Sequence, residues 1–390
     1  MTDLTTARQD RLLTALGDAP FDAFLAASPA NVHHATGYRS VATRVFRQHQ
    51  MAALVAPGGA TLVCPVADAG PAVDAGVNSD DLVCYGRFYF ESVDPSAAVP
   101  RLVDQHGSLT GAAVTALGRR LPAGGVVGVD VDGLGVHWAS LQAALPPGVS
   151  AVDASAWALR VRAVKLPAEV ELLRQAAALA EDGIARAMSK AAPGVSEQEL
   201  AAEVAHAMVA GRGEPLFVVV TSGPRSALAD APATTRRFQP GDLLRFDVGC
   251  VLDGYWSDVG RTAVVGEPSP EQQRRYDAIL AGEQAQLDRL RPGMPANELF
   301  DIAVTTVEAH GVVPYRRQHC GHGIGGDVYE PPIISPAFDT PLAPGMTFCF
   351  ETPYYELGWG GMMVEDTLVV TDSGYQLLTS MDRSLRVVAA

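Results

Sequence analysis

The sequence predicts an α+β protein in which a smaller α/β domain, residues 1–157, precedes a larger α+β domain, residues 158–390. Three observations predict this arrangement. Short apolar segments alternate with helical patterns in the first part, a long helical pattern begins near residue 167, and helices followed by strands occur twice in the rest. Alternating strands and helices are typical of α/β layers, whereas separate runs of each are typical of α+β domains.

In the first domain, apolar segments bounded by Pro, Gly or Asn predict strands, because these residues favour turns. The strands are expected at residues 21–28, 51–57, 60–66 and 125–131. The helices are expected at residues 7–17, 95–117 and 136–145.

The second domain is expected to open with two helices. Pro167 suits the first turn of a helix, and Glu169 and Glu171 complement the helix dipole there. Ser196 and Glu199 have the spacing of a capping box, which predicts the start of the second helix. Two further helices are expected at residues 269–291 and 295–310. Strands are expected at residues 216–222, 242–257, 260–266, 346–355, 362–371 and 375–379. This order indicates two similar halves.

The composition limits the classes of partner and compartment. The formal net charge is −15, which disfavours binding to nucleic acid or to anionic membranes. The five cysteines have no C-x-x-C spacing, so we expect neither a disulfide framework nor a structural zinc site. The sequence shows no signal peptide and no apolar run long enough to span a bilayer. We therefore expect a cytoplasmic protein.

Four carboxylates interrupt apolar strand patterns. Asp247 and Asp258 lie in "RFDVGCVLDGYWSDVGRT", where a hairpin turn near residues 253–254 would let them face each other. Glu351 and Glu365 lie in "FCFETPYY" and "MMVEDTLVV". A buried carboxylate is unfavourable unless it is paired or bound to metal. Arg261 is the main neighbouring cation in the sequence, so we expect divalent cations to neutralise the rest.

His322 adds an imidazole from the glycine-rich stretch "QHCGHGIGGDVYEPP". Four carboxylates and one imidazole suit Mn, Co, Zn or Fe(II), and two such ions are expected. Each carboxylate alone is also consistent with a turn or edge residue. The stretch matches G-x-G-x-x-G too, but residues 340–350 contain no acid where a dinucleotide loop needs one. The metal interpretation is therefore favoured.

These motifs resemble those of the pita-bread metallopeptidases of family M24, which include methionine aminopeptidase, Xaa-Pro aminopeptidase and prolidase. The resemblance covers about residues 158–390 and rests on "FDVGCVLDGYWSDVGRT", "CGHGIGGDVYEPP", "PGMTFCFETP" and "GGMMVEDTLVVT", in family order. The segment "VRAVKLPAEVELLRQAA" is similar to the linker helix of prolidase-like members. Residues 1–157 resemble the creatinase-type N-terminal domain. The resemblance implies a C-terminal pita-bread (creatinase/aminopeptidase) fold.

The resemblance also implies a dinuclear metal site. Asp247 and Asp258 would bind one ion, His322 and Glu351 would bind the other, and Asp258 and Glu365 would bridge them. Such a pair can activate water and polarise a carbonyl at neutral pH. The glycines around His322 would allow close approach of strands and metal. A homodimer is implied as well, with the N-terminal domain covering the active site of the partner.

The sequence departs from the family around the metals. Tyr329 and Asp230 stand at positions where the peptidases carry histidines. Gln318 stands at a third such position, with His319 beside it, and Met363 replaces an arginine. The metal ligands are thus kept while the residues that face the substrate differ.

Tyr329 and Asp230 are the candidate catalytic residues. A tyrosine hydroxyl can donate a hydrogen bond to a reacting oxygen, although its ordinary pKa of about 10 makes it a poor base. Asp230 would favour a cationic group in the substrate. The alternatives are ordinary packing for Tyr329 and a solvated loop position for Asp230.

Two function classes follow from these residues. We expect a dinuclear metal-dependent hydrolase of an amide or peptide bond, similar to Xaa-Pro aminopeptidase or prolidase, with a small molecule or short peptide as substrate. The alternative is a non-peptidase relative that acts on a small cationic substrate, either by C–N hydrolysis or by metal-dependent elimination from sulfonium compounds. A metal-free binding module is disfavoured because all five ligand positions are present.

Overall fold

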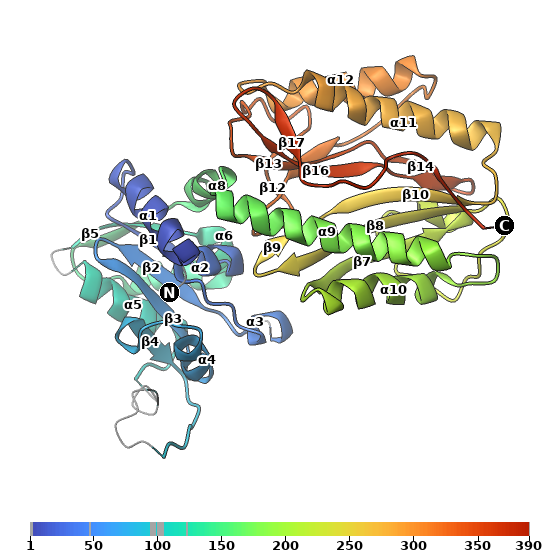
Figure 1. Cartoon of the computed structure of the whole chain (residues 1–390). Coiled ribbons are helices and arrows are strands. Elements are labelled where there is room, and N and C mark those ends of the chain that lie inside the picture. Colours follow the sequence, from blue (N-terminus) through green and yellow to red (C-terminus); the bar gives the residue numbers. More distant parts are fainter. Residues whose placement is uncertain (1–2, 47, 94–98, 100–104, 122–123, 390) are drawn as a thin grey trace. The chain divides into compact units, whose positions relative to one another are not determined.

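The computed structural model describes residues 3–46, 48–93, 99, 105–121 and 124–389 (Figure 1). It divides into two compact units, Met1–Arg162 and Ala163–Ala390. The boundary predicted at residues 157–158 falls inside helix α8 (Ser155–Ala163), just before this division. A domain boundary at that position stays a prediction.

The first unit contains one mixed sheet in the order β4-β3-β2-β1-β5-β6. Its strands are β1 (Ala23–Ala26), β2 (Ala52–Ala56), β3 (Gly59–Pro65), β4 (Leu82–Tyr85), β5 (Gly125–Val129) and β6 (Val149–Asp153). Its other helices are α1 (Asp3–Gly17), α2 (Pro29–Thr36), α3 (Ala42–Val45), α4 (Ala69–Asp74), α5 (Leu109–Arg120), α6 (Val131–Leu134) and α7 (Trp138–Ala144). Short 3-10 turns are η1 (Val66–Asp68), η2 (Ser79–Asp81) and η4 (Gly135–His137).

Helices cover both faces of this sheet, as expected for an α/β unit. Phe24 packs in the cluster that contains Leu12 of α1, whereas the next residue, Leu25, packs in the cluster that contains Leu117 of α5. Neighbouring strand residues point to opposite faces, so β1 joins both cores. The predicted helix at residues 95–117 includes positions 95–98 and 100–104, which lie outside the described residues, and α5 begins only at Leu109.

The second unit contains a ten-stranded sheet whose main path is β12-β11-β13-β16-β10-β8-β7. The strands on this path are β7 (Glu214–Ser222), β8 (Leu243–Leu252), β10 (Val259–Val265), β11 (Gly321–Gly323), β12 (Glu330–Ile333), β13 (Thr347–Glu351) and β16 (Glu365–Val370). Strands β9 (Tyr255–Trp256), β17 (Tyr375–Leu377) and β18 (Arg386–Val388) pair with β8, β16 and β10. A separate hairpin joins β14 (Tyr354–Glu356) and β15 (Gly360–Met362).

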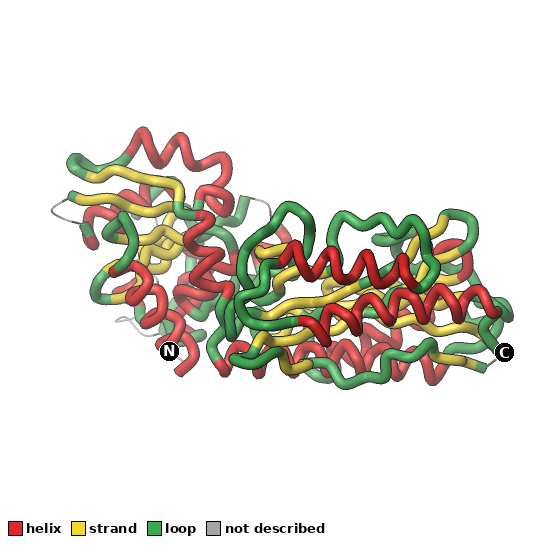
Figure 2. The backbone as a smooth tube through the Cα atoms, turned by 90° about the horizontal axis from the view of Figure 1, so that it is seen from above, coloured by secondary structure: helices red, strands yellow, loops and turns green. Residues whose placement is uncertain are grey.

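Two pairs of helices flank this sheet (Figure 1). They are α9 (Pro167–Lys190) with α10 (Glu197–Ala210), and α11 (Pro270–Arg289) with α12 (Ala296–Ala309). Phe246 of β8 packs with the first pair, and Phe348 of β13 packs with the second. Figure 2 shows these helices running along the strands that they cover. The unit therefore has the two similar helix-and-sheet halves that the sequence predicted.

Local signals explain where the helices begin. Pro167 is the first residue of α9, and the Glu169 side chain accepts a hydrogen bond of 2.7 Å from the Leu166 amide. The Ser196 and Glu199 capping box is present at the start of α10. None of the helices in the described residues has both the length and the apolar character that a membrane span requires.

Candidate metal centre and active site

The five candidate ligands lie on neighbouring strands of the second sheet. Asp247 is in β8, Asp258 directly precedes β10, His322 is in β11, Glu351 ends β13 and Glu365 begins β16. In the strand register, Gly260 of β10 lies opposite both Asp247 and Glu365, and Glu351 lies opposite Glu365. Residues far apart in the chain thus meet at one place in the sheet.

The predicted hairpin is present, with one interruption. Its turn is at residues 253–254, where Asp253 has a φ of 46°, and β8 pairs first with β9 and then with β10. Asp258 lies in the break between β9 and β10, outside regular pairing. This break brings Asp258 close to two other candidate ligands. One carboxylate oxygen each of Asp247, Asp258 and Glu365 lie within 4.8 Å of one another.

His322 faces the same group of carboxylates. Its Nε2 atom lies 3.7 Å from Asp258 Oδ2 and 3.8 Å from Glu365 Oε1. Its Nδ1 atom lies 3.0 Å from the carbonyl oxygen of Gly323, which can only accept a hydrogen bond. Nδ1 therefore carries the proton, and the lone pair of Nε2 is available to a metal.

Three ligand atoms in this group are buried and find no hydrogen-bond partner in the described part of the chain. They are Asp258 Oδ1, His322 Nε2 and Glu365 Oε2. Buried polar atoms in proteins nearly always have a partner, so each exception calls for an explanation. Oxygen donors with one imidazole nitrogen fit divalent metal ions, which would satisfy all three atoms.

The pKa values of these side chains also favour bound cations. Burial, assisted by the charge of Glu351, raises the pKa of Asp247 to about 7 although Arg245 opposes the shift. Burial and the neighbouring carboxylates also raise the pKa values of Asp258 and Glu365. Burial lowers the pKa of His322, so its ring is neutral. Bound cations would relieve the repulsion among these carboxylates.

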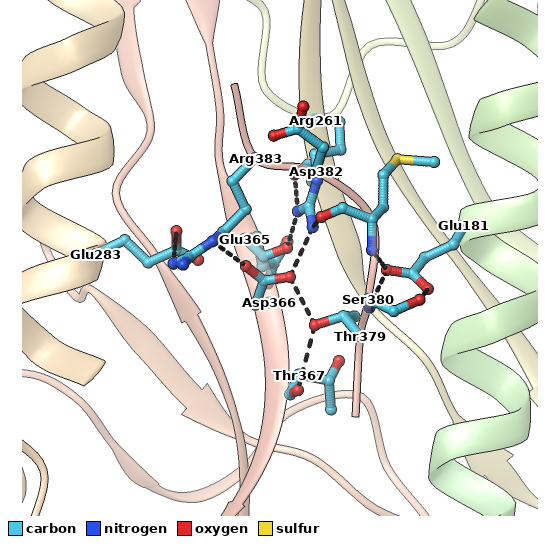
Figure 3. Close-up of polar contacts among 12 residues, drawn as sticks. Glu181, Arg261, Glu283, Glu365, Asp366, Thr367, Thr379, Ser380, Asp382 and Arg383 are labelled. Atoms are coloured by element: carbon cyan, nitrogen blue, oxygen red, sulfur yellow. Dashed lines mark hydrogen bonds and ion pairs between the residues drawn. The ribbon is translucent and has the colours of Figure 1, made fainter. Parts of the chain in front are cut away.

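Arg261 does not neutralise the ligand side chains, so that prediction is wrong. Its guanidinium is fully buried and donates hydrogen bonds of 2.6 Å to the main-chain carbonyl of Glu365 and 2.6 Å to the carboxylate of Asp366 (Figure 3). Side chains alternate along β10, so Arg261 points away from the face where Gly260 meets Glu365. Arg245 of β8 instead pairs with Asp247 at 2.9 Å.

Arg261 belongs to a buried polar network behind Glu365 (Figure 3). Asp366 also accepts a hydrogen bond of 2.6 Å from Thr379 and lies 3.6 Å from Arg383 Nε. Arg383 lies 3.5 Å from Glu283 of α11. The network thus connects β10, β16 and the segment after β17 to a helix, and it fixes the backbone at Glu365.

The glycines beside His322 are required by close packing of strands. A Cβ atom on Gly321 would lie 2.4 Å from the carbonyl oxygen of Cys349, and one on Gly323 would lie 2.5 Å from that of Glu330. His322 lies in a strand between β12 and β13 rather than in a loop that leads into a helix. This position rules out the dinucleotide-loop alternative.

Cys349 is a neighbour that the sequence did not single out. Its Sγ atom lies within 4.8 Å of ligand atoms of His322 and Glu365. Burial raises the pKa of its thiol, and Sγ lies 3.7 Å from the carbonyl oxygen of Asp258. A protonated thiol is a weak metal ligand, so we do not include Cys349 in the ligand set.

A cavity of about 410 Å³ lies beside the candidate ligands. Among the residues that line it are Asp230, Arg317, Gln318, His319, Tyr329 and Met363. The sequence-predicted Asp230 is exposed on its wall, and Tyr329 is 49% exposed. The structure therefore brings both candidate catalytic residues to the cavity.

Tyr329 is held beside the candidate ligand His322. The two rings stack with centroids 3.7 Å apart and planes 18° apart. The next residue, Glu330, forms a buried ion pair with Lys165 at 2.6 Å, which fixes the backbone beside the tyrosine. Burial and the charge of Glu351 raise the pKa of the Tyr329 hydroxyl, so it remains a hydrogen-bond donor at neutral pH.

His319 and Arg317 surround Glu351. His319 Nδ1 lies 2.9 Å from Glu351 Oε1, and Arg317 lies 3.8 Å from Glu351 Oε2. Burial alone would raise the pKa of Glu351, but these neighbours hold it below its ordinary value. In the sequence, the position of His319 next to Gln318 was the one signal for this residue.

The chain matches known proteins over both units. Residues 171–372 match metallopeptidase family M24, and residues 8–164 match the creatinase/prolidase N-terminal domain. The Xaa-Pro dipeptidase of Pyrococcus furiosus is 34% identical over 227 residues, which are 58% of this chain and 65% of that protein, slightly less than two thirds of its length. The Xaa-Pro dipeptidase of Lactobacillus helveticus is 31% identical over 264 residues, 67% of this chain and 72% of that protein.

Solved structures match nearly the whole chain. The dipeptidase PepE of Mycobacterium ulcerans is 27% identical with a TM-score of 0.80, and the match covers 100% of both chains. The prolidase of Pyrococcus horikoshii is 25% identical with a TM-score of 0.78, and the match covers 97% of this chain and 99% of the prolidase.

Proposed function

Because the chain belongs to metallopeptidase family M24, we propose that it uses two divalent metal ions to hydrolyse the Xaa-Pro bond of short peptides. The family and the fold class, a pita-bread domain preceded by a creatinase-type N-terminal domain, are confirmed. One observation carries the proposal. Asp258, His322 and Glu365 each have a buried ligand atom without a hydrogen-bond partner in the described residues, and Asp258 and Glu365 line a cavity.

In this proposal, Asp247, Asp258, His322, Glu351 and Glu365 hold the two ions. When bound, the ions supply a nucleophilic water at neutral pH and polarise the carbonyl of the scissile bond. Mn, Co, Zn and Fe(II) all suit this ligand set.

The remaining residues of the cavity act on the substrate. The Tyr329 hydroxyl donates a hydrogen bond to the carbonyl oxygen as negative charge develops on it. The exposed Asp230 contacts the positive amino group at the start of the peptide. His319 keeps Glu351 ionised and oriented. The placement of Tyr329, Asp230 and His319 on the cavity wall supports these roles.

The test uses protein freed of metal by a chelator and then reloaded with Mn(II), Co(II), Zn(II) or Fe(II). We expect hydrolysis of Xaa-Pro dipeptides that requires added metal and disappears in a Glu365→Ala variant. A panel of N-acyl amino acids, guanidino compounds and sulfonium compounds is assayed in parallel. Protein that carries two ions per chain but leaves every Xaa-Pro dipeptide intact would refute the proposal.

A second candidate is C–N hydrolysis or elimination on a small cationic substrate. The observation that favours it is the acidic wall of the cavity, where Asp230 adds an exposed carboxylate to those of the candidate ligands. Turnover of the guanidino or sulfonium compounds, with Xaa-Pro dipeptides untouched, would select this candidate.

The protein is further proposed to be a cytoplasmic homodimer without nucleic-acid or membrane partners. All five cysteines are free and buried, which suits a reducing compartment. Light scattering at micromolar concentration should give twice the 40.9 kDa mass of one chain. The mass of a single chain would contradict the dimer.

A further inference from the structure

Arg317 differs in charge from the acidic residues that line the active-site cavity. Those residues include Asp230, Asp258 and Glu365. Among the lining residues that the structure describes, Arg317 is the one with a permanent positive charge, because a guanidinium remains protonated in proteins. A cation at this position is suited to bind a negatively charged group of the substrate.

The hydrogen-bonding capacity of Arg317 is largely unused. Its guanidinium lies 3.8 Å from Glu351 Oε2, which is too long for a hydrogen bond. Its buried Nε has no hydrogen-bond partner in the described part of the protein. A buried donor without a partner is unfavourable, so a ligand that supplies acceptor oxygens would be stabilised there.

Aromatic packing orients this guanidinium. The Arg317 guanidinium lies 5.6 Å from the centroid of the Tyr355 ring, and that of Arg245 lies 5.3 Å from the same centroid. A guanidinium that stacks on an aromatic ring keeps the donors along its edge free. These donors form a planar fork that matches the two oxygens of a carboxylate.

Glu351 would compete less for Arg317 in the working enzyme than in the metal-free protein. His319 already lies 2.9 Å from one oxygen of Glu351. A metal ion bound by Glu351 would take up its negative charge, leaving the charge of Arg317 available to an anion. Glu351 therefore lies beside Arg317 without neutralising its charge. An anionic group of the substrate would neutralise it instead.

We propose that Arg317 binds the C-terminal carboxylate of the substrate and so makes the enzyme selective for dipeptides. This inference rests on the proposed Xaa-Pro hydrolysis at the same site. In a dipeptide the carboxylate and the amino group lie on either side of the scissile bond. Arg317 and Asp230, which line the same cavity, would bind these two opposite charges.

The kinetic test compares Ala-Pro with its C-terminal amide, which lacks the negative charge. Metal-loaded wild-type protein should prefer Ala-Pro by about 10- to 100-fold in kcat/KM, the range expected for a charge-assisted contact. Arg317→Gln should abolish this preference by raising KM for Ala-Pro, with little change for the amide. Arg317→Lys should retain part of the preference.

The matched control is Arg316→Gln. Arg316 precedes Arg317, is exposed, and is absent from the described lining of the cavity. This variant loses the same charge and should keep the wild-type preference. Metal content is measured in every variant, because a residue that acts only by holding Glu351 would change it. Equal losses of kcat on both substrates, with metal lost, would overturn the proposal.

A binding measurement separates this inference from the reaction itself. Calorimetry with L-proline and L-prolinamide should show that wild-type protein binds proline more tightly and that Arg317→Gln does not discriminate. Preference for proline without turnover of any Xaa-Pro dipeptide would refute the proposed reaction and keep the role of Arg317. Turnover of Ala-Pro and its amide at equal rates by wild-type protein would refute the role of Arg317.

Discussion

Tyr329 combines two features that suit a hydrogen-bond donor in catalysis. It stacks on the imidazole of His322, and its raised pKa keeps the hydroxyl protonated. A tyrosine there can stabilise a developing oxyanion but does not readily remove a proton. The chemistry assigned to this position is therefore donation rather than general base catalysis.

Removal of the Tyr329 hydroxyl should slow the chemical step. Tyr329→Phe should lower kcat by about 100- to 1,000-fold, the loss typical of one oxyanion donor, and leave KM nearly unchanged. The measurement is steady-state kinetics on the best Xaa-Pro substrate with metal content verified. Tyr375→Phe is the control, because it removes a partly buried hydroxyl on β17, outside the described lining of the cavity. Wild-type kcat in Tyr329→Phe would mean that the ring only packs.

Asp230 should act mainly in binding. Asp230→Asn removes the negative charge that faces the amino group, so we expect KM to rise about two- to fivefold with kcat little changed. Asp372→Asn, an exposed change on a turn away from the cavity, should leave KM unaffected. Unchanged kcat/KM in Asp230→Asn would show that Asp230 is a solvated loop residue.

Side-chain alternation along strands explains which site residues could be predicted. Arg245 precedes Asp247 by two positions, and this spacing places both on one face of β8, so the sequence held enough information to find the pair. The same rule turns Arg261 away from the ligands. Arg317 and His319 lie in an irregular segment before β11, where no period indicates the direction of a side chain. Only the structure places them beside Glu351.

Whole elements differ in how strongly the sequence indicates them. The long helices and central strands were predicted because their apolar patterns and caps are strong. Strands β4 and β6 were missed; both are edge strands, and β6 is largely exposed. Helix α2 was missed although Ser28 caps it by accepting a hydrogen bond from the Asn31 amide.

The network behind β16 should stabilise the second unit. Asp366→Asn leaves Arg261 without its buried counter-charge, whereas Arg383 keeps Glu283, so we expect a loss of about 3–5 kcal/mol in the free energy of unfolding. Asp382→Asn is the matched control. Its side chain is 56% exposed and pairs with Arg386 on the surface, a contact worth about 0–1 kcal/mol. Urea denaturation of the metal-loaded proteins measures the free energy of unfolding of both variants. Equal losses in Asp366→Asn and Asp382→Asn would argue against the network.

Metal should control the stability of the whole molecule in a pH-dependent way. Without metal, folded Asp247 has a pKa of about 7, above the value of about 3.9 in an unfolded chain. The folded state then binds more protons, so stability should fall as pH rises between about 4 and 7. The raised pKa values of Asp258 and Glu365 act in the same sense.

Thermal denaturation at pH 5, 6, 7 and 8 tests this expectation, once with chelator and once with excess Mn(II). The difference in Tm between the two forms should widen as pH rises, because metal binds the ionised carboxylates. Titratable groups outside the site affect the Tm of the chelator-treated and the Mn(II)-loaded protein equally, so their effect cancels in the Tm difference. A Tm difference that stays constant from pH 5 to pH 8 would contradict a metal centre built from these residues.

The order of the strands along the chain has a consequence for biosynthesis. β10 lies between β8 and β16 in the sheet, but β16 follows β10 in the chain only after two long helices and five other strands. While the ribosome is still making that intervening stretch, Asp247 and Asp258 do not yet have Glu365 beside them. With the proposed ligand set, we expect metal loading to follow the translation of Glu365, and a nascent chain halted earlier should retain no metal of its own.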